Sequence, residues 1–156
     1  MRGKKKAPKR KIKPDIKYSN TTVAKFINYL MKRGKKTTAQ AVLYGAFEII
    51  AEKTKKEPLE VFEAAFKNVS PQLEVRSKRV GGANYQIPYP VKGDRKFALA
   101  SRWILGAARG KKGKSMAERL AEELMSASKN EGAAIKKKED VQRMAEANRA
   151  FAHFAR

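Results

Sequence analysis

The spacing of apolar residues changes twice along this sequence, and that change limits the folds open to it. Apolar side chains recur every three or four positions up to about residue 70, every second position between residues 73 and 91, and every three or four positions again after residue 95. A helix brings every third or fourth residue to one face, whereas a strand brings every second residue there. The pattern predicts a mainly helical protein with one short β element.

Three helices are predicted before the β element. The first follows Ser19 and Asn20, residues that can both cap a helix N-terminus, and ends at Arg33-Gly34. The second opens at Thr37 or Thr38, and the third opens with Pro58, which suits a first helical turn. Because the connections are short, these helices should pack as antiparallel neighbours and supply much of the core.

The β element is predicted as a hairpin over residues 72–91, broken at Gly81-Gly82. Pro88 and Pro90 lie on its return strand. Proline cannot donate to a strand ladder, so this strand cannot lie in the middle of a sheet. We expect an isolated ribbon that projects from the helices and packs on them at its base or is ordered by a partner.

Three more helices are predicted over residues 95–109, 115–128 and 133–148, with Asp94 and Ser115 at the cap positions of the first two. At the other end, residues 1–17 carry nine cations, two prolines and a single acid. Self-repulsion and proline should keep that segment extended.

The predicted fold is therefore mainly α, a bundle of about six helices with one protruding β-hairpin and a disordered basic N-terminal arm. Residues 1–17 form the arm, and residues 18–156 form a single helical domain that includes the hairpin. One domain is also the usual expectation at a length of 156 residues.

The positive charge is concentrated in two segments. The chain has 37 Lys and Arg against 15 Asp and Glu, a net charge of +22, of which residues 1–36 hold +13 and residues 71–114 hold +9. Two basic segments that meet in space form one surface for a polyanion. An anionic membrane would call for a basic helix with a spare apolar stripe, which the sequence does not offer, so nucleic acid is the favoured partner.

The sequence contains few of the residue types that enzyme catalysis requires. With no Cys and one His, the sequence excludes disulfides, thiol catalysis and Cys-ligated zinc, and we expect no metal, no cofactor and no catalytic residues. The loop at residues 110–114 lacks the spacing of a nucleotide-binding loop. Glu118, Glu122 and Glu123 are interpreted as exposed ion-pair partners on a helix. No secretory or membrane-spanning run is visible, so a soluble intracellular protein is expected.

The candidate nucleic-acid contacts lie on the arm, at the end of the first helix, on the hairpin and on the fourth helix with its following loop. Arg95, Arg102 and Arg109 are seven residues apart, nearly two helical turns, and should line one face. Arginine offers a planar fork to phosphate, and lysine offers a mobile point charge. The candidates are Arg2, Lys4, Lys5, Lys6, Lys9, Arg10, Lys11, Lys13, Lys25, Lys32, Arg33, Lys35, Lys36, Arg76, Lys78, Arg79, Arg95, Lys96, Arg102, Arg109, Lys111, Lys112 and Lys114.

Other interpretations stay open for several of these features. The arm suits a solvated tail or localisation signal equally well, and part of the Lys32–Lys36 cluster could serve to cap a helix. Tyr85 and Tyr89 could stack on bases, although packing is favoured for them, as it is for Trp103. An irregular RNA is slightly favoured over DNA, and an architectural DNA-binding protein is the alternative.

Several longer motifs resemble one known family. They are the stretches Leu73–Arg76, Arg79–Pro88, Arg102-Trp103, Met116–Leu120 and Met144–His153, together with the turn Gly34–Lys36. Over essentially the whole chain, these motifs are similar to the ribosomal protein seven family of the bacterial small subunit.

The resemblance implies a cytoplasmic, non-enzymatic ribosomal protein that binds the 3′ major domain of small-subunit ribosomal RNA and nucleates assembly of the head. It implies that the hairpin tip, Gly81, Gly82, Ala83, Asn84 and Tyr85, lies near the exit-site tRNA and the mRNA path. It also implies that Phe151, His153 and Phe154 approach ribosomal protein eleven among other head proteins, and that the chain is not a homo-oligomer. Some members repress their own mRNA.

Overall fold

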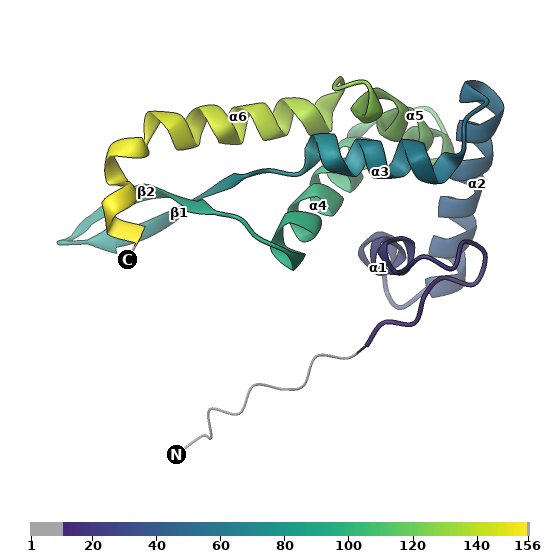
Figure 1. Cartoon of the computed structure of the whole chain (residues 1–156), viewed down its shortest axis with the longest axis horizontal. Coiled ribbons are helices and arrows are strands. Elements are labelled where there is room, and N and C mark those ends of the chain that lie inside the picture. Colours follow the sequence, from purple (N-terminus) through teal and green to yellow (C-terminus); the bar gives the residue numbers. More distant parts are fainter. Residues whose placement is uncertain (1–10, 156) are drawn as a thin grey trace, which may run out of the picture.

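The computed structural model describes residues 11–155 and consists mostly of helices with one two-stranded antiparallel sheet (Figure 1). This arrangement confirms the predicted helical bundle with a single hairpin, while residues 1–10 of the predicted arm lie outside the described part of the chain. In chain order the elements are α1 (Thr21–Leu30), α2 (Lys36–Thr54), α3 (Pro58–Val69), β1 (Leu73–Val80), β2 (Ala83–Pro90), α4 (Asp94–Gly110), α5 (Met116–Ser128), α6 (Ala133–Ala147) and the 3-10 helix η1 (Arg149–Ala155).

Two helix ends differ from the prediction for backbone reasons. Helix α1 ends at Leu30 instead of Arg33-Gly34, because the backbone becomes extended at Met31, whose ψ of 135° lies outside the helical region. At α4 the N-cap is Gly93, with φ of 49°, and Asp94 is the first helical residue, so the predicted capping role of Asp94 is wrong.

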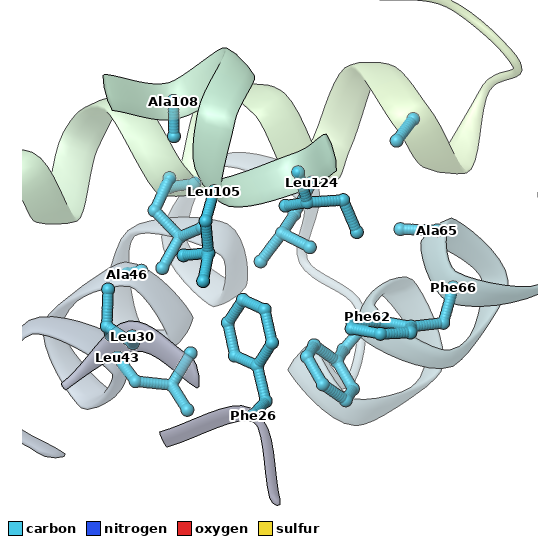
Figure 2. Packing of buried hydrophobic residues seen from close by; sticks show 14 of the residues in the cluster. Phe26, Leu30, Leu43, Ala46, Phe62, Ala65, Phe66, Leu105, Ala108 and Leu124 are labelled. Atoms are coloured by element: carbon cyan, nitrogen blue, oxygen red, sulfur yellow. The ribbon is translucent and has the colours of Figure 1, made fainter. Parts of the chain in front are cut away.

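The core is built where α1, α2, α3, α4 and α5 meet. Figure 2 shows Phe26 of α1 among Phe62 and Phe66 of α3, with Leu105 of α4 and Leu124 of α5 beside them. The ring of Phe26 lies 5.4 Å from each of the other two rings, edge to face in both cases. Tight aromatic packing of this kind makes the helical body a rigid base for the surface loops.

The side chain of Asn20 caps α1. Its Oδ1 accepts hydrogen bonds from the backbone N–H groups of Thr22 at 2.7 Å and Val23 at 3.4 Å. Replacing Asn20 with Ala should lower the free energy of unfolding by about 1 kcal/mol, since two N–H groups at the helix start lose their acceptor. Chemical denaturation measures this, and Asn28→Ala, an exposed change within the same helix, should cost nothing comparable.

Asp15 fastens the chain to α2 ahead of α1. Its side chain is only 5% exposed and accepts hydrogen bonds from the Tyr44 hydroxyl at 2.8 Å and from the N–H groups of Lys17 and Tyr18 at 3.2 Å each. Burial, reinforced by the bond to Asp15, raises the pKa of the Tyr44 hydroxyl. Asp15 is thus bonded to the helical body although it lies within the segment predicted to be the arm.

The hairpin turns through two glycines. The strands pair from Leu73 opposite Pro90 to Val80 opposite Ala83, and the connecting Gly81 and Gly82 have φ of 57° and 92°. Two successive positive φ angles are the signature of a tight turn that matches strand twist, and glycine adopts them without strain. The ribbon extends away from α4, with α6 alongside β1 and η1 packed on β2 (Figure 1). It is thus supported along its length and not only at its base.

Candidate nucleic-acid interface

A basic groove lies where the end of α1, the start of α2, the end of α4 and the start of α5 meet. Its volume is about 440 Å³, and its lining contains four cations and no acid. Two of the cations precede α2 and two belong to α4 and α5, so the groove joins the two basic segments of the sequence. The basic groove is lined by Leu30, Lys32, Lys35, Thr38, Ala39, Val42, Arg109, Met116 and Arg119.

The two arginines of the basic groove are held in place by backbone oxygens. Arg109 donates from Nη2 to the carbonyl of Leu30 at 3.1 Å, and Arg119 donates from Nη1 to the carbonyl of Lys111 at 2.6 Å. These bonds tie α4 to α1 and α5 to the loop that precedes it. They leave the groove with two fixed guanidinium groups and two exposed lysines, Lys32 and Lys35.

The lysines at the start of α2 oppose the helix dipole. Lys35 is the N-cap of α2 and Lys36 is its first residue, and the N-terminus of this helix has no side-chain cap bond. The N-terminus of a helix carries partial positive charge, so cations there are unfavourable for folding. The alternative that this cluster caps a helix therefore applies only to Lys32 and Arg33, which follow α1.

A second cleft, of about 820 Å³, lies between the start of the described chain, α1 and the start of α4. Lys25 in its wall donates to the Asp94 carboxylate at 3.2 Å, and the rings of Tyr29 and Phe97 lie 6.0 Å apart. Here too residues of both basic segments meet. The cleft is lined by Lys11, Ile12, Thr21, Lys25, Asn28, Tyr29, Asp94 and Phe97.

The arginine stripe on α4 is less uniform than its spacing suggested. Arg102 is exposed and makes no hydrogen bond or ion pair with another described residue. In contrast, Arg109 donates to the carbonyl of Leu30, and Arg95 pairs with the Glu74 carboxylate. No acid follows Asp94 on α4 itself, but Glu74 reaches this stripe from β1. An acid on a different element is invisible to a pattern read along one helix.

Glu74 is a buried carboxylate between the hairpin and α4. It is 6% exposed, and its Oε2 lies 2.9 Å from Nε and 2.8 Å from Nη2 of Arg95. The Arg76 guanidinium donates to its other oxygen. Burial alone would raise the pKa of Glu74, but the hydrogen bonds and charges of the two arginines outweigh burial and hold that pKa below its usual value.

The loop between α4 and α5 is held by acids of α5. Lys111 Nζ lies 3.0 Å from Oε2 of Glu123, and Lys114 pairs with Glu122. The bond from Lys114 lowers the pKa of Glu122, and the same bond raises the pKa of Lys114. Glu123 is fully buried, so its interpretation as an exposed ion-pair partner is wrong.

The C-terminal helix η1 packs on the hairpin through aromatic rings. Tyr85 lies 5.1 Å from Phe151 and 5.4 Å from Phe154 between ring centroids, and Lys78 donates to the carbonyl of Phe154 at 2.8 Å. The favoured packing of Tyr85 is thus present, with His153 exposed beside it. Trp103 likewise packs against the core, as expected.

The predicted contact residues fall into three groups. Arg2, Lys4, Lys5, Lys6, Lys9 and Arg10 lie outside the described residues. Those exposed and without a hydrogen bond or ion pair to another described side chain are Lys11, Lys13, Lys32, Arg33, Lys35, Lys36, Arg79, Arg102 and Lys112, while Lys96 is half-buried. Those that bond within the protein are Lys25, Arg76, Lys78, Arg95, Arg109, Lys111 and Lys114.

Sequence reasoning missed two residues of the interface, Arg119 and Glu74, and did not foresee the burial of a third, Glu123. Arg119 lines the basic groove. Glu74 forms an ion pair with Arg95, and Glu123 forms one with Lys111. The available signal was the scarcity of acids, because Glu74 and Asp94 are the only two between residues 71 and 114.

Two other kinds of site have no counterpart between residues 11 and 155. No helix there is both long and apolar enough to cross a membrane. Nor do three or more His, Cys, Asp or Glu side chains gather there as a metal site would require.

Comparison with known proteins gives one consistent result. A family model described as ribosomal protein S7p/S5e matches residues 2–149. The chain is 60% identical to the small ribosomal subunit protein uS7 of Thermotoga maritima over 151 residues, 97% of each chain. It is 56% identical to that of Maricaulis maris, over 96% of each chain, and 53% identical to that of Sorangium cellulosum, over 99% of each. With two basic segments meeting on a helical body that bears one ribbon, this chain belongs to the ribosomal protein S7p/S5e family.

Proposed function

We propose that this chain binds the 3′ major domain of small-subunit ribosomal RNA and nucleates the assembly of the head around it. As a member of a ribosomal protein family, the chain is a structural constituent of the ribosome and not an enzyme. The observation that carries the proposal is the basic groove, where cations of both basic segments meet Arg119 of α5 without an acid in the lining. Such a surface suits phosphates that approach from several directions, as in folded RNA.

The energetics of the α2 start support an anionic partner. Lys35 and Lys36 lie against the unfavourable end of a helix dipole, so folding gains nothing from their charge. A phosphate placed there would meet both the lysines and the free N–H groups of the first turn.

The finer placement on the ribosome is part of the same proposal. We assign the exposed tip residues Gly81 to Asn84 to the neighbourhood of the exit-site tRNA and the mRNA path. The exposed side of η1 at His153 would approach ribosomal protein eleven, while Phe151 and Phe154 use part of their surface on Tyr85.

Replacing Lys32, Lys35 and Lys36 together with Gln should weaken binding to a 3′ major domain RNA fragment at least about tenfold, because three charge-assisted contacts to phosphate are lost. The free energy of unfolding should stay level or rise by a few tenths of a kcal/mol, since two cations leave a helix N-terminus. Filter binding and urea denaturation measure the two quantities.

The matched control is Lys129, Lys136 and Lys137 to Gln, which removes the same charge from exposed positions around α6. Equal weakening by both triple variants would mean that only the total charge matters. That result would contradict the assignment of the basic groove as an RNA-binding site. Stronger competition by duplex DNA than by the RNA fragment at equal salt would favour the architectural DNA-binding alternative.

A further inference from the structure

Glu74 lies between the hairpin and α4, in one of the two basic segments of the chain. A carboxylate is unexpected there for a protein that binds RNA. The segment of residues 71–114 carries eleven Lys and Arg against two acids. Of these two, Asp94 is exposed and Glu74 is buried. A purely electrostatic view makes Glu74 unfavourable, because it reduces the attraction of nearby cations for phosphate.

The geometry of Glu74 suggests a different role. Each of its carboxylate oxygens is taken by one arginine, Oε2 by Arg95 at 2.9 Å and 2.8 Å and Oε1 by Arg76. One arginine comes from the hairpin and the other from α4. The carboxylate therefore helps to fix the orientation of the ribbon relative to α4.

Both arginines remain open to solvent while Glu74 does not. The side chains of Arg76 and Arg95 are 55% and 43% exposed, against 8% for that of Glu74. Arg76 also lies over the ring of Tyr89, with 5.3 Å from its guanidinium carbon to the ring centroid. A guanidinium has five N–H donors, so pairing with one carboxylate oxygen leaves donors for phosphate on each arginine.

We propose that Glu74 is a positioning residue for RNA binding, which holds Arg76 and Arg95 together as a two-pronged phosphate contact at the base of the ribbon. This inference rests on the proposed function and adds a specific site to it. The three groups carry a net charge of one, and their fixed geometry lowers the entropy that each arginine loses when it binds phosphate.

The test is Glu74→Gln in the full chain, with binding to the 3′ major domain fragment as the readout. The substitution removes one negative charge. If Glu74 only neutralised nearby cations, RNA binding should therefore become tighter. A positioning role predicts weaker binding by about tenfold, the scale of one well-placed arginine contact. Glu63→Gln, the same charge change at an exposed site of α3, is the control and should bind as the parent protein does or slightly tighter.

Two further variants separate this role from a general effect on folding. In a chain that already carries Arg76→Gln and Arg95→Gln, adding Glu74→Gln should weaken RNA binding no further. Arg95→Lys keeps the charge but loses the fork, and should bind about fivefold more weakly, whether or not Glu74→Gln folds.

Binding by Glu74→Gln that equals or exceeds that of the parent would overturn the proposal, as would parent-like binding by Arg95→Lys. A further loss in the double-arginine background would also overturn it. Failure of the parent chain to prefer the RNA fragment over duplex DNA would instead overturn the proposed function, so the two failures are distinguishable.

Discussion

Raising the salt concentration from 50 to 200 mM should weaken binding to the 3′ major domain fragment by about a thousandfold or more. Nine of the predicted contact residues are exposed cations without a hydrogen bond or ion pair to another described side chain, from Lys11 to Lys112. If about eight phosphates are neutralised, the counterions released from the RNA make affinity fall with a log–log slope of about −6. Titrations at four or five salt concentrations measure that slope directly.

The same titration distinguishes the groove from diffuse attraction. The Lys32, Lys35 and Lys36 to Gln variant should lower the magnitude of the slope by about 2, because three phosphate contacts are lost. The control at Lys129, Lys136 and Lys137 should leave the slope near the parent value. A parent slope of about −2 or less in magnitude would contradict a broad phosphate-binding surface.

Much of the fold was predictable because its signals are local. Asn20, Pro58 and Ser115 stand at or next to helix starts, and Gly81-Gly82 forms the hairpin turn. Each of these residues acts on backbone within three or four positions of itself. Helix ends were less accurate where the backbone leaves the helical region with no glycine or proline to mark the place, as at Met31.

The candidate site was predictable only at the level of charge. The two basic segments do meet, at Lys35 and Arg109 in the basic groove. Which cations remain available for a partner depends on acids and carbonyls brought in from elsewhere, such as Glu74 for Arg95 and Leu30 for Arg109. Those pairs are separated by 21 and 79 residues, so no sequence window contains them.

The buried carboxylate of Glu123 is the feature on which the loop between α4 and α5 depends most. Its Oε1 accepts the backbone N–H of Ala134 at 2.9 Å and its Oε2 lies 3.0 Å from Nζ of Lys111. A Cβ at Gly132 would lie 3.0 Å from the same Oε1, so this carboxylate also occupies the space at the start of α6. One side chain thus joins α5, α6 and the basic loop.

Replacing Glu123 with Leu should lower the free energy of unfolding by about 3 kcal/mol. The substitution leaves the N–H of Ala134 buried without an acceptor and leaves Lys111 without its buried partner. Glu123→Gln keeps an acceptor for Ala134 but loses the charge, and about half of that loss is expected. Urea denaturation followed by circular dichroism measures both.

Glu122→Gln is the matched control, because Glu122 precedes Glu123 on α5 and pairs with Lys114 at the surface. Its side chain is 27% exposed, so its loss should cost less than about 1 kcal/mol. Equal effects at the two positions would show that burial of Glu123 contributes nothing. A larger effect at Glu123 would mean that Lys111 serves mainly to hold the loop, which leaves Lys112 and Lys114 as its cations for RNA.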